Sequence, residues 1–305
     1  MLPAQAASAQ TPAAPTENVT VTGAKSREAL ENFAKAFIAT TKRTGKIARW
    51  ERGVCPLVMG QKPDVIGFIT QRVKAVAEAV GAPVNSEPAC TPNIEIIFTT
   101  TPQALMDSTR KNNPDYLGYA TTSDQRDRLA TVIRPIQAWY LTETVDLDGV
   151  PRIDSGRMQG SGIAMSNFSP ITMPSTGPGN RDPIYMPDAT YARVTGNHIN
   201  DGARSNFHHI LIVVDSTRLA GQKLIPLADY ITMLALTQLN VLDTCQQLPS
   251  IVNLLATNCD HGIDGITAND LAYLHALYTM GSDKSGVFQK DDIADAMVDR
   301  LAKGK

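Results

Sequence analysis

One short apolar run, residues 207–215, constrains the fold more than any other part of the sequence. It reads Phe-His-His-Ile-Leu-Ile-Val-Val-Asp. An apolar run with so few interruptions is typical of a strand in a sheet whose two faces are both covered. Strand-like and helix-like segments alternate through the first half of the chain, as they do in layered α/β proteins. The sequence therefore predicts an α/β (α+β) fold in which helices pack against a sheet.

Apolar periodicity and turn residues place the individual elements along the chain. Strands are expected at residues 18–22, 47–55, 93–100, 136–145 and 207–215. Helices are expected after a Ser26 N-cap through residue 38, and at residues 64–80, 102–111, 123–132, 227–242, 248–255, 268–280 and 291–302. Asp148-Gly149 predicts a turn after the fourth strand. The last third of the chain is thus expected to be mostly helical.

The domain organisation follows from length and local composition. Hydrophobic residues make up 43% of the 305 residues, which is enough for a sizeable core. Residues 18–305 are interpreted as a single domain, with an α/β half at 18–150, a loop rich in Gly, Pro and Ser at 151–190, and a strand-plus-helix half at 191–305. The Met and Phe residues of the loop predict that it lies on the body of the protein, with a short hairpin inside it.

The first residues carry a weak export signal. Ala7-Ser8-Ala9 before Gln10 has the small-x-small pattern of a signal-peptidase site, although a charged n-region and an apolar h-region are missing. Residues 1–17 are therefore interpreted as a signal-peptide remnant or a disordered tail rich in Ala and Pro. The first interpretation predicts a periplasmic or secreted bacterial protein.

Four cysteines allow three pairings. Pairing by neighbourhood predicts disulfides Cys55–Cys90 and Cys245–Cys259, one in each half of the chain. A zinc site is the rival, but neither C-x₂-C nor a Cys/His spacing is present. The other alternative is four inert buried thiols in a cytosolic protein. Disulfides agree better with export, because they persist in oxidising compartments.

Charge and hydropathy exclude several classes of partner. The net charge is −2, from 28 basic and 30 acidic residues, and no concentrated basic face is apparent. We therefore expect no binding to nucleic acid. No apolar stretch approaches the roughly 20 residues that cross a bilayer, so no transmembrane segment is expected. The expected partner is an unknown envelope or extracellular component, and no cofactor is expected.

The motifs of common enzyme chemistries are missing from the sequence. It contains no G-x-S-x-G, P-loop, G-x-G-x-x-G or H-E-x-x-H pattern. The sequence has five histidines, so few ligands are available for a His-based metal site. No catalytic residue and no metal ligand is therefore predicted.

Five polar residues remain as binding candidates. His208 and His209 begin the central strand, and because neighbours in a strand face opposite sides, they cannot share one metal without distortion. The alternative for each is an exposed or hydrogen-bonded histidine without a function. Asp229, Tyr230 and Thr232 interrupt an otherwise apolar helix, and the alternative for them is the solvated edge of that helix.

The second half of the chain resembles zincin-like metallopeptidases, and in particular the metzincin order of elements. In that order a core strand leads to the helix with H-E-x-x-H, a turn with Ser-x-Met, and a closing helix of the type Leu-[Ser/Thr]-x-x-Asp…Leu-Tyr. Residues 210–215, 227–242, 249–252 and 266–278 follow it, and the last segment matches well. The resemblance implies a zincin-like mixed sheet packed by helices.

The active-site positions depart from this family. Residues 228–232, Ala-Asp-Tyr-Ile-Thr, occupy the place of H-E-x-x-H, and Val252 replaces the methionine. Alanine cannot bind zinc and threonine is a poor zinc ligand, so Asp229 alone keeps the acidic character of the general base. Without zinc to activate a water, that carboxylate has no nucleophile to work with. The resemblance therefore implies a relative without catalytic activity.

The whole chain is also similar to uncharacterised secreted proteins of sphingomonad- and caulobacter-type α-proteobacteria. The shared features are Val-Thr-Val-Thr-Gly at 19–23, paired cysteines around a helix, and Ala-Tyr-Leu-x-Ala-Leu-Tyr at 272–278. The likeness implies export and carries no activity. The expected function is an exported pseudo-enzyme that binds or scaffolds an unknown ligand. The alternatives are a periplasmic or secreted hydrolase with an unrecognised active site, and a structural envelope protein.

Overall fold

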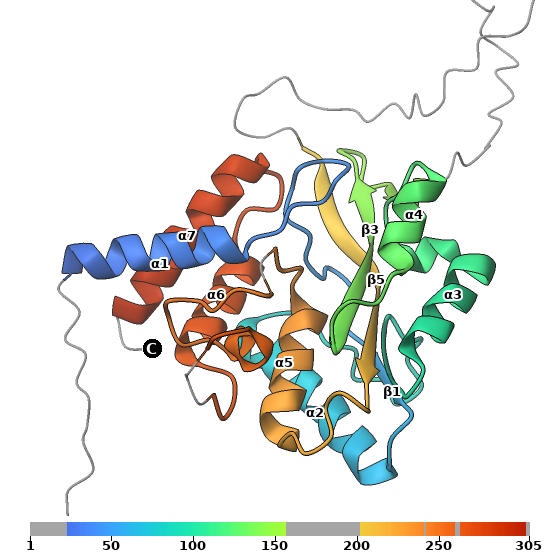
Figure 1. Cartoon of the computed structure of the whole chain (residues 1–305). Helices are drawn as coiled ribbons and strands as arrows, with labels where there is room; N and C mark the ends of the chain where they lie inside the picture. The colour runs from blue at the N-terminus through green and yellow to red at the C-terminus, as the bar shows by residue number, and fades with distance from the viewer. Residues whose placement is uncertain (1–22, 157–201, 241, 260–262, 303–305) are drawn as a thin grey trace, which may run out of the picture.

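The computed structural model describes residues 23–156, 202–240, 242–259 and 263–302. Within these residues the chain forms a five-stranded mixed sheet, so the predicted α/β fold is confirmed (Figure 1). The strand order is β1-β2-β5-β3-β4. The strands are β1 (Pro56–Met59), β2 (Ile94–Thr99), β3 (Ile136–Val145), β4 (Pro151–Ile153) and β5 (Arg204–Asp215).

Strand β5 lies at the centre of the sheet, as its apolar run predicted. It pairs in parallel with β2, where Ile94 is opposite Ile210, and antiparallel with β3, where Ile136 is opposite Val214. Strand β1 extends the parallel side and β4 the antiparallel side. The apolar residues of β5 are buried almost without interruption, because both faces of the sheet are covered.

Helices cover the two faces unequally. The larger core lies between the sheet and helices α1, α2, α5, α6 and α7, and the smaller one beneath α3, η1 and α4 (Figure 1). The helices are α1 (Gly23–Phe37), α2 (Pro63–Val80), α3 (Pro102–Asn112), η1 (Pro114–Leu117), α4 (Ser123–Ala130), α5 (Leu224–Leu236), η2 (Ile251–Leu255), α6 (Ala268–Thr279) and α7 (Gly286–Ala302). None of these described helices is both long and apolar enough to span a membrane.

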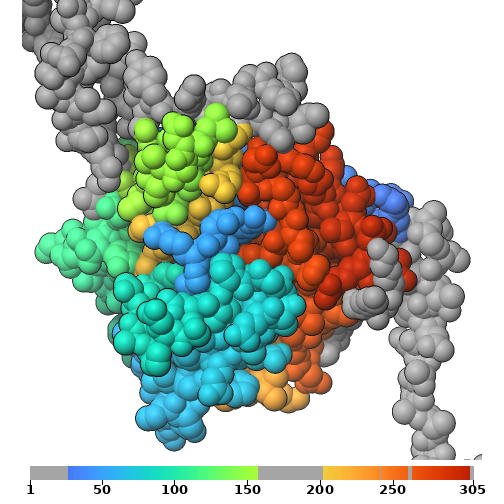
Figure 2. Space-filling model, turned by 180° about the vertical axis from the view of Figure 1, so that it is seen from behind, coloured from blue at the N-terminus to red at the C-terminus, as the bar shows by residue number. Residues whose placement is uncertain are grey.

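Residues 47–55 were expected to form a strand, and this expectation is wrong. The segment makes only isolated bridges, at Arg49 and Val54. Its polar groups instead bind to helices: the Trp50 indole donates to the Ala235 carbonyl at 2.8 Å and Arg49 donates to the Met280 carbonyl at 2.8 Å. Seen from behind, this blue segment crosses the surface between the sheet and the red C-terminal helices (Figure 2).

Several helix boundaries differ from the expectation, among them the start of α1, which lies at Gly23 rather than after a Ser26 N-cap, and the start of α5, which lies at Leu224 rather than at residue 227. Helix α5 ends at Leu236 rather than at residue 242, because Thr237 is extended and the Tyr140 hydroxyl donates to the carbonyls of Leu234 and Thr237. These tyrosine bonds take the place of the next helical turn. Helix α7 begins at Gly286 rather than at residue 291. Its first turn exposes Val287 and Phe288, which hides the helical periodicity.

The loop expected at 151–190 begins later than its composition suggested. Residues 151–153 form β4, which pairs with the end of β3 across the predicted Asp148-Gly149 turn. Residues 154–156 are described and lie in neither a helix nor a strand. The expected strand at 18–22 and residues 157–190 of the loop, with its expected hairpin, lie outside the described residues. So does the tail at 1–17.

Both predicted disulfides are confirmed. Cys55 is bonded to Cys90, with their Cα atoms 6.1 Å apart, and Cys245 to Cys259, with their Cα atoms 5.3 Å apart. The first joins the chain before β1 to the chain before β2. The second encloses η2.

Candidate functional site

Asp229 lies on α5 and is fully buried, with 0% exposure. Its Oδ1 accepts a hydrogen bond from Nε of Arg72 on α2, and its Oδ2 accepts one from Nη2 of the same guanidinium at 3.0 Å. The Ile266 N–H also donates to Oδ2, at 2.8 Å. The hydrogen bond and the charge of Asp229 raise the pKa of Arg72 despite its partial burial. The carboxylate therefore ties α5 to α2 and to the chain before α6.

The backbone passes closely over this carboxylate at Gly265. A Cβ atom at this position would lie only 2.9 Å from Oδ2 of Asp229. A residue without a side chain thus lets the Ile266 N–H reach the carboxylate. Asp229 itself therefore does not lie on a solvated edge of α5, contrary to the simplest alternative for it, although Ile225 one turn earlier is exposed.

Tyr230 and Thr232 are also core residues rather than the solvated edge of the helix. Tyr230 is 1% exposed, and burial raises its pKa far above the usual value. The Thr232 hydroxyl donates to the Ala228 carbonyl at 2.7 Å within the helix. Ala228 and Thr232, which the resemblance to zincin-like peptidases aligned with the two zinc-binding histidines, are both completely buried.

His208 lies at a β-bulge. Leu141 pairs with His209 and Thr142 pairs with Phe207, so that His208 is the extra residue of β5. Bulges redirect side chains, and they are frequent beside functional sites. Here Nδ1 of His208 lies 2.9 Å from Oε2 of Glu143 on β3.

Arg52 completes this cluster at the surface. Its guanidinium donates to Glu143 Oε2 at 2.8 Å, and one of its nitrogens lies 2.8 Å from Nδ1 of His208. Burial opposes ionisation of Glu143, but the hydrogen bond with His208 and the charge of Arg52 outweigh it, so the pKa of Glu143 lies below its usual value. The arrangement holds an ionised carboxylate behind a partly exposed imidazole.

The next residue along β5, His209, has its partners on β2 and η1. Its Nε2 lies 3.5 Å from Oε1 of Glu95 on β2, and its ring meets Tyr116 edge-on with the centroids 4.5 Å apart. Neither ring nitrogen has a hydrogen-bond partner among the described residues. The structure thus gives the two histidines separate surroundings, and gives Asp229 a third set of partners.

Asp270 was not among the predicted site residues, and it holds the turn around Ser250 against α6. It forms a capping box with Thr267 at the start of α6. Its carboxylate also accepts the Ser250 hydroxyl at 2.5 Å and the Ile251 N–H at 2.8 Å. Thr267 directly precedes the helix expected at 268–280, whereas the distant turn that shares the Asp270 carboxylate had no local signal.

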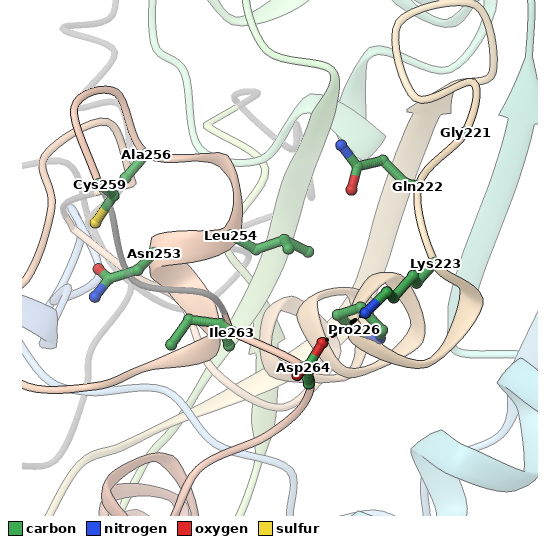
Figure 3. Close-up of a pocket in the computed structure, with 10 residues that line it drawn as sticks. All are labelled: Gly221, Gln222, Lys223, Pro226, Asn253, Leu254, Ala256, Cys259, Ile263 and Asp264. Atoms are coloured by element: carbon green, nitrogen blue, oxygen red, sulfur yellow. Dashed lines mark hydrogen bonds and ion pairs between the residues drawn. The ribbon is translucent and has the colours of Figure 1, made fainter. Parts of the chain in front are cut away.

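A pocket opens beside the beginning of α5, with a volume of about 370 Å³. Its walls come from the chain before α5, from η2 and from the chain before α6 (Figure 3). The lining residues are Gly221, Gln222, Lys223, Pro226, Asn253, Leu254, Ala256, Cys259, Ile263 and Asp264. Lys223 and Asp264 form an ion pair of 2.9 Å across it.

Comparison with known proteins places the chain in no family: no family model, no curated protein and no solved structure matches it. Across the ranges that the structure describes, no three or more His, Cys, Asp or Glu side chains group as metal ligands would. The candidate sites are therefore the Asp229 cluster, the His208 cluster and the pocket, each judged by its own geometry.

Proposed function

We propose that the chain is an exported, non-catalytic binding or scaffold protein, a pseudo-enzyme built on a zincin-like core. The observation that carries this proposal is the state of Asp229. Its carboxylate has no exposed surface and accepts three hydrogen bonds from Arg72 and Ile266. A general base must reach a water or a substrate proton. A carboxylate that is buried and already hydrogen-bonded in this way has a structural role.

The order of elements supports the zincin-like part of the proposal. Strand β5 leads to α5, a turn around Ser250 follows, and α6 closes the series. Asp270 joins that turn to α6 through buried hydrogen bonds. The scaffold of such an enzyme is thus kept, while Ala228 and Thr232 fill the ligand positions with core side chains.

Export and binding rest on two further features. The chain has two disulfides, which persist in oxidising compartments such as the periplasm. The pocket beside α5 favours binding over a purely structural envelope role, since its volume falls in the range of small-ligand sites.

Metal analysis with a peptidase assay tests the proposal. The full chain, purified without chelators and dialysed against zinc, is expected to carry far less than one zinc per molecule and to leave casein uncleaved. Asp229→Asn is expected to lower stability without changing either readout. One tightly held zinc per chain, or proteolysis that Asp229→Asn abolishes, would contradict the proposal.

A hydrolase that uses His208 is the second candidate. The observation in its favour is the Glu143 carboxylate at Nδ1, since a carboxylate in this position orients an imidazole so that Nε2 can accept a proton. The test is hydrolysis of activated esters by the wild type, by His208→Ala and by the control His275→Ala. A rate above background that only His208→Ala removes would favour this candidate. Equal rates in all three proteins would dismiss it.

A further inference from the structure

The rim of the pocket beside α5 carries one cation and one anion that, among the described residues, are paired only with each other. The Lys223 ammonium lies 2.9 Å from the Asp264 carboxylate. Their side chains are 77% and 83% exposed, respectively. An ion pair so exposed contributes little to stability. A ligand can therefore separate the two groups at low cost.

The wall beneath this pair mixes polar and apolar side chains. Leu254 points into the hollow toward Gln222, and Pro226 and Ile263 border the ion pair (Figure 3). The Gln222 carboxamide has no hydrogen bond with any described residue, so it is available to a ligand. The pocket thus joins a dipolar rim to a wall on which Leu254 and Ile263, both partly exposed, supply apolar surface.

This wall is held firmly in place. Its η2 part lies between Cys245 and Cys259, which are joined by a disulfide. The Asn253 side chain, which is buried, accepts the Gln246 N–H at 2.8 Å and donates to the Gln246 carbonyl at 3.2 Å. A wall fixed before binding loses little freedom when a ligand arrives.

We propose that this pocket binds a small zwitterion with an aliphatic side chain, of the class of free α-amino acids. The ligand ammonium pairs with Asp264 and the ligand carboxylate pairs with Lys223, so that one protein ion pair is exchanged for two. The aliphatic side chain covers Leu254, Pro226 and Ile263. This inference rests on the proposed binding function and names its ligand class.

Binding of L-leucine to the full chain, followed by calorimetry or NMR titration at neutral pH, tests the proposal. We expect saturable binding at millimolar concentrations or below, weakened at least about tenfold by Lys223→Ala and by Asp264→Ala. N-acetyl-L-leucine lacks the ammonium and L-leucinamide lacks the carboxylate, so each is expected to bind at least about tenfold more weakly than L-leucine. Lys284→Ala is the matched control, since it removes another surface ion pair, with Asp292, and is expected to leave binding unchanged.

Three results would overturn the inference: no saturable binding of L-leucine, equal binding by the Lys223→Ala or Asp264→Ala variants, or equal binding of the two blocked compounds. Circular dichroism of each variant shows whether it is folded. If L-leucine does not bind but the protein also holds no zinc and leaves casein uncleaved, only the ligand class is refuted and the proposed function is not. Stoichiometric zinc refutes the proposed function whatever the leucine titration gives.

Discussion

At the scale of single residues, the position that the family resemblance made most interesting is a structural one. The resemblance aligned Asp229 with a general base, yet both of its oxygens accept hydrogen bonds, from Arg72 and the Ile266 N–H. A buried charge of this kind is tolerated only while its partners remain. Asp229 connects three segments of the chain in this way.

Arg72→Met should therefore destabilise the protein, because it leaves the Asp229 carboxylate buried without its counter-ion. Breaking a buried ion pair costs about 3–5 kcal/mol, and since Arg72 is 34% exposed we expect about 2–3 kcal/mol in the free energy of unfolding. Adding Asp229→Leu should recover part of the loss. The control Arg110→Met breaks an exposed pair with Asp127 and should cost less than about 1 kcal/mol. Equal losses in urea denaturation for the two single variants would contradict the assignment.

Glu143 gives a prediction that depends on pH. Its pKa is lowered in the folded chain, so its ionisation stabilises the fold above its ordinary pKa, and this stabilisation is lost as pH falls through the folded pKa. The wild type should exceed Glu143→Gln in unfolding free energy at pH 7. The difference should shrink as pH falls below about 4. Glu28→Gln, at an exposed position of α1, should show little difference at any pH. A gap for Glu143→Gln that widens in acid would refute the assignment.

At the scale of elements, α6 and the turn that packs on it form one unit through Asp270. Asp270→Ala removes the acceptor for the Ser250 hydroxyl, the Ile251 N–H and the Thr267 N–H together, while the Thr267 side chain can still cap α6. We expect a loss of about 3 kcal/mol in unfolding free energy, at about 1 kcal/mol for each donor that loses its acceptor. Thr122→Ala removes only the cap of α4 and should cost about 1 kcal/mol. Equal losses would show that the turn does not depend on Asp270.

The elements that the sequence predicted well are those with a strong local signal. Strand β3 and helices α2 and α6 show clear periodicity, with Pro, Gly or Thr at their ends, and they lie within a residue or two of their expected positions. Residues 47–55 are apolar enough for a strand, but Trp50 bonds to Ala235, 185 positions later, and Arg49 bonds to Met280, 231 positions later. Tertiary contacts of this kind leave no local pattern.

The candidate sites were predictable only in part for the same reason. The sequence identified Asp229 and His208 as unusual, whereas the β-bulge at His208, which interrupts the strand period, left no local signal. Their partners Arg72, Arg52 and Glu143 are ordinary charged residues on other elements, so nothing in their neighbourhoods marks them. The ion pair between Lys223 and Asp264 likewise depends on the folded path of the chain.

At the scale of the whole molecule, the two disulfides are expected to have different roles. Removing one should mainly lower the unfolding free energy, and removing the other should mainly weaken ligand binding. Cys55–Cys90 spans 35 positions and Cys245–Cys259 spans 14, so the chain-entropy model gives losses of about 4 and about 3 kcal/mol when each pair is replaced by serine. Cys55→Ser/Cys90→Ser should therefore lower the unfolding free energy more.

Binding should follow the opposite order. Cys259 lines the pocket and its disulfide encloses η2, whereas neither Cys55 nor Cys90 lines it. Under conditions in which both double variants are folded, Cys245→Ser/Cys259→Ser should weaken L-leucine binding several-fold, because the pocket wall becomes free to move before the ligand arrives. Cys55→Ser/Cys90→Ser should bind as the wild type does. If the less stable variant were also the weaker binder, the pocket would depend on global stability rather than on its own disulfide.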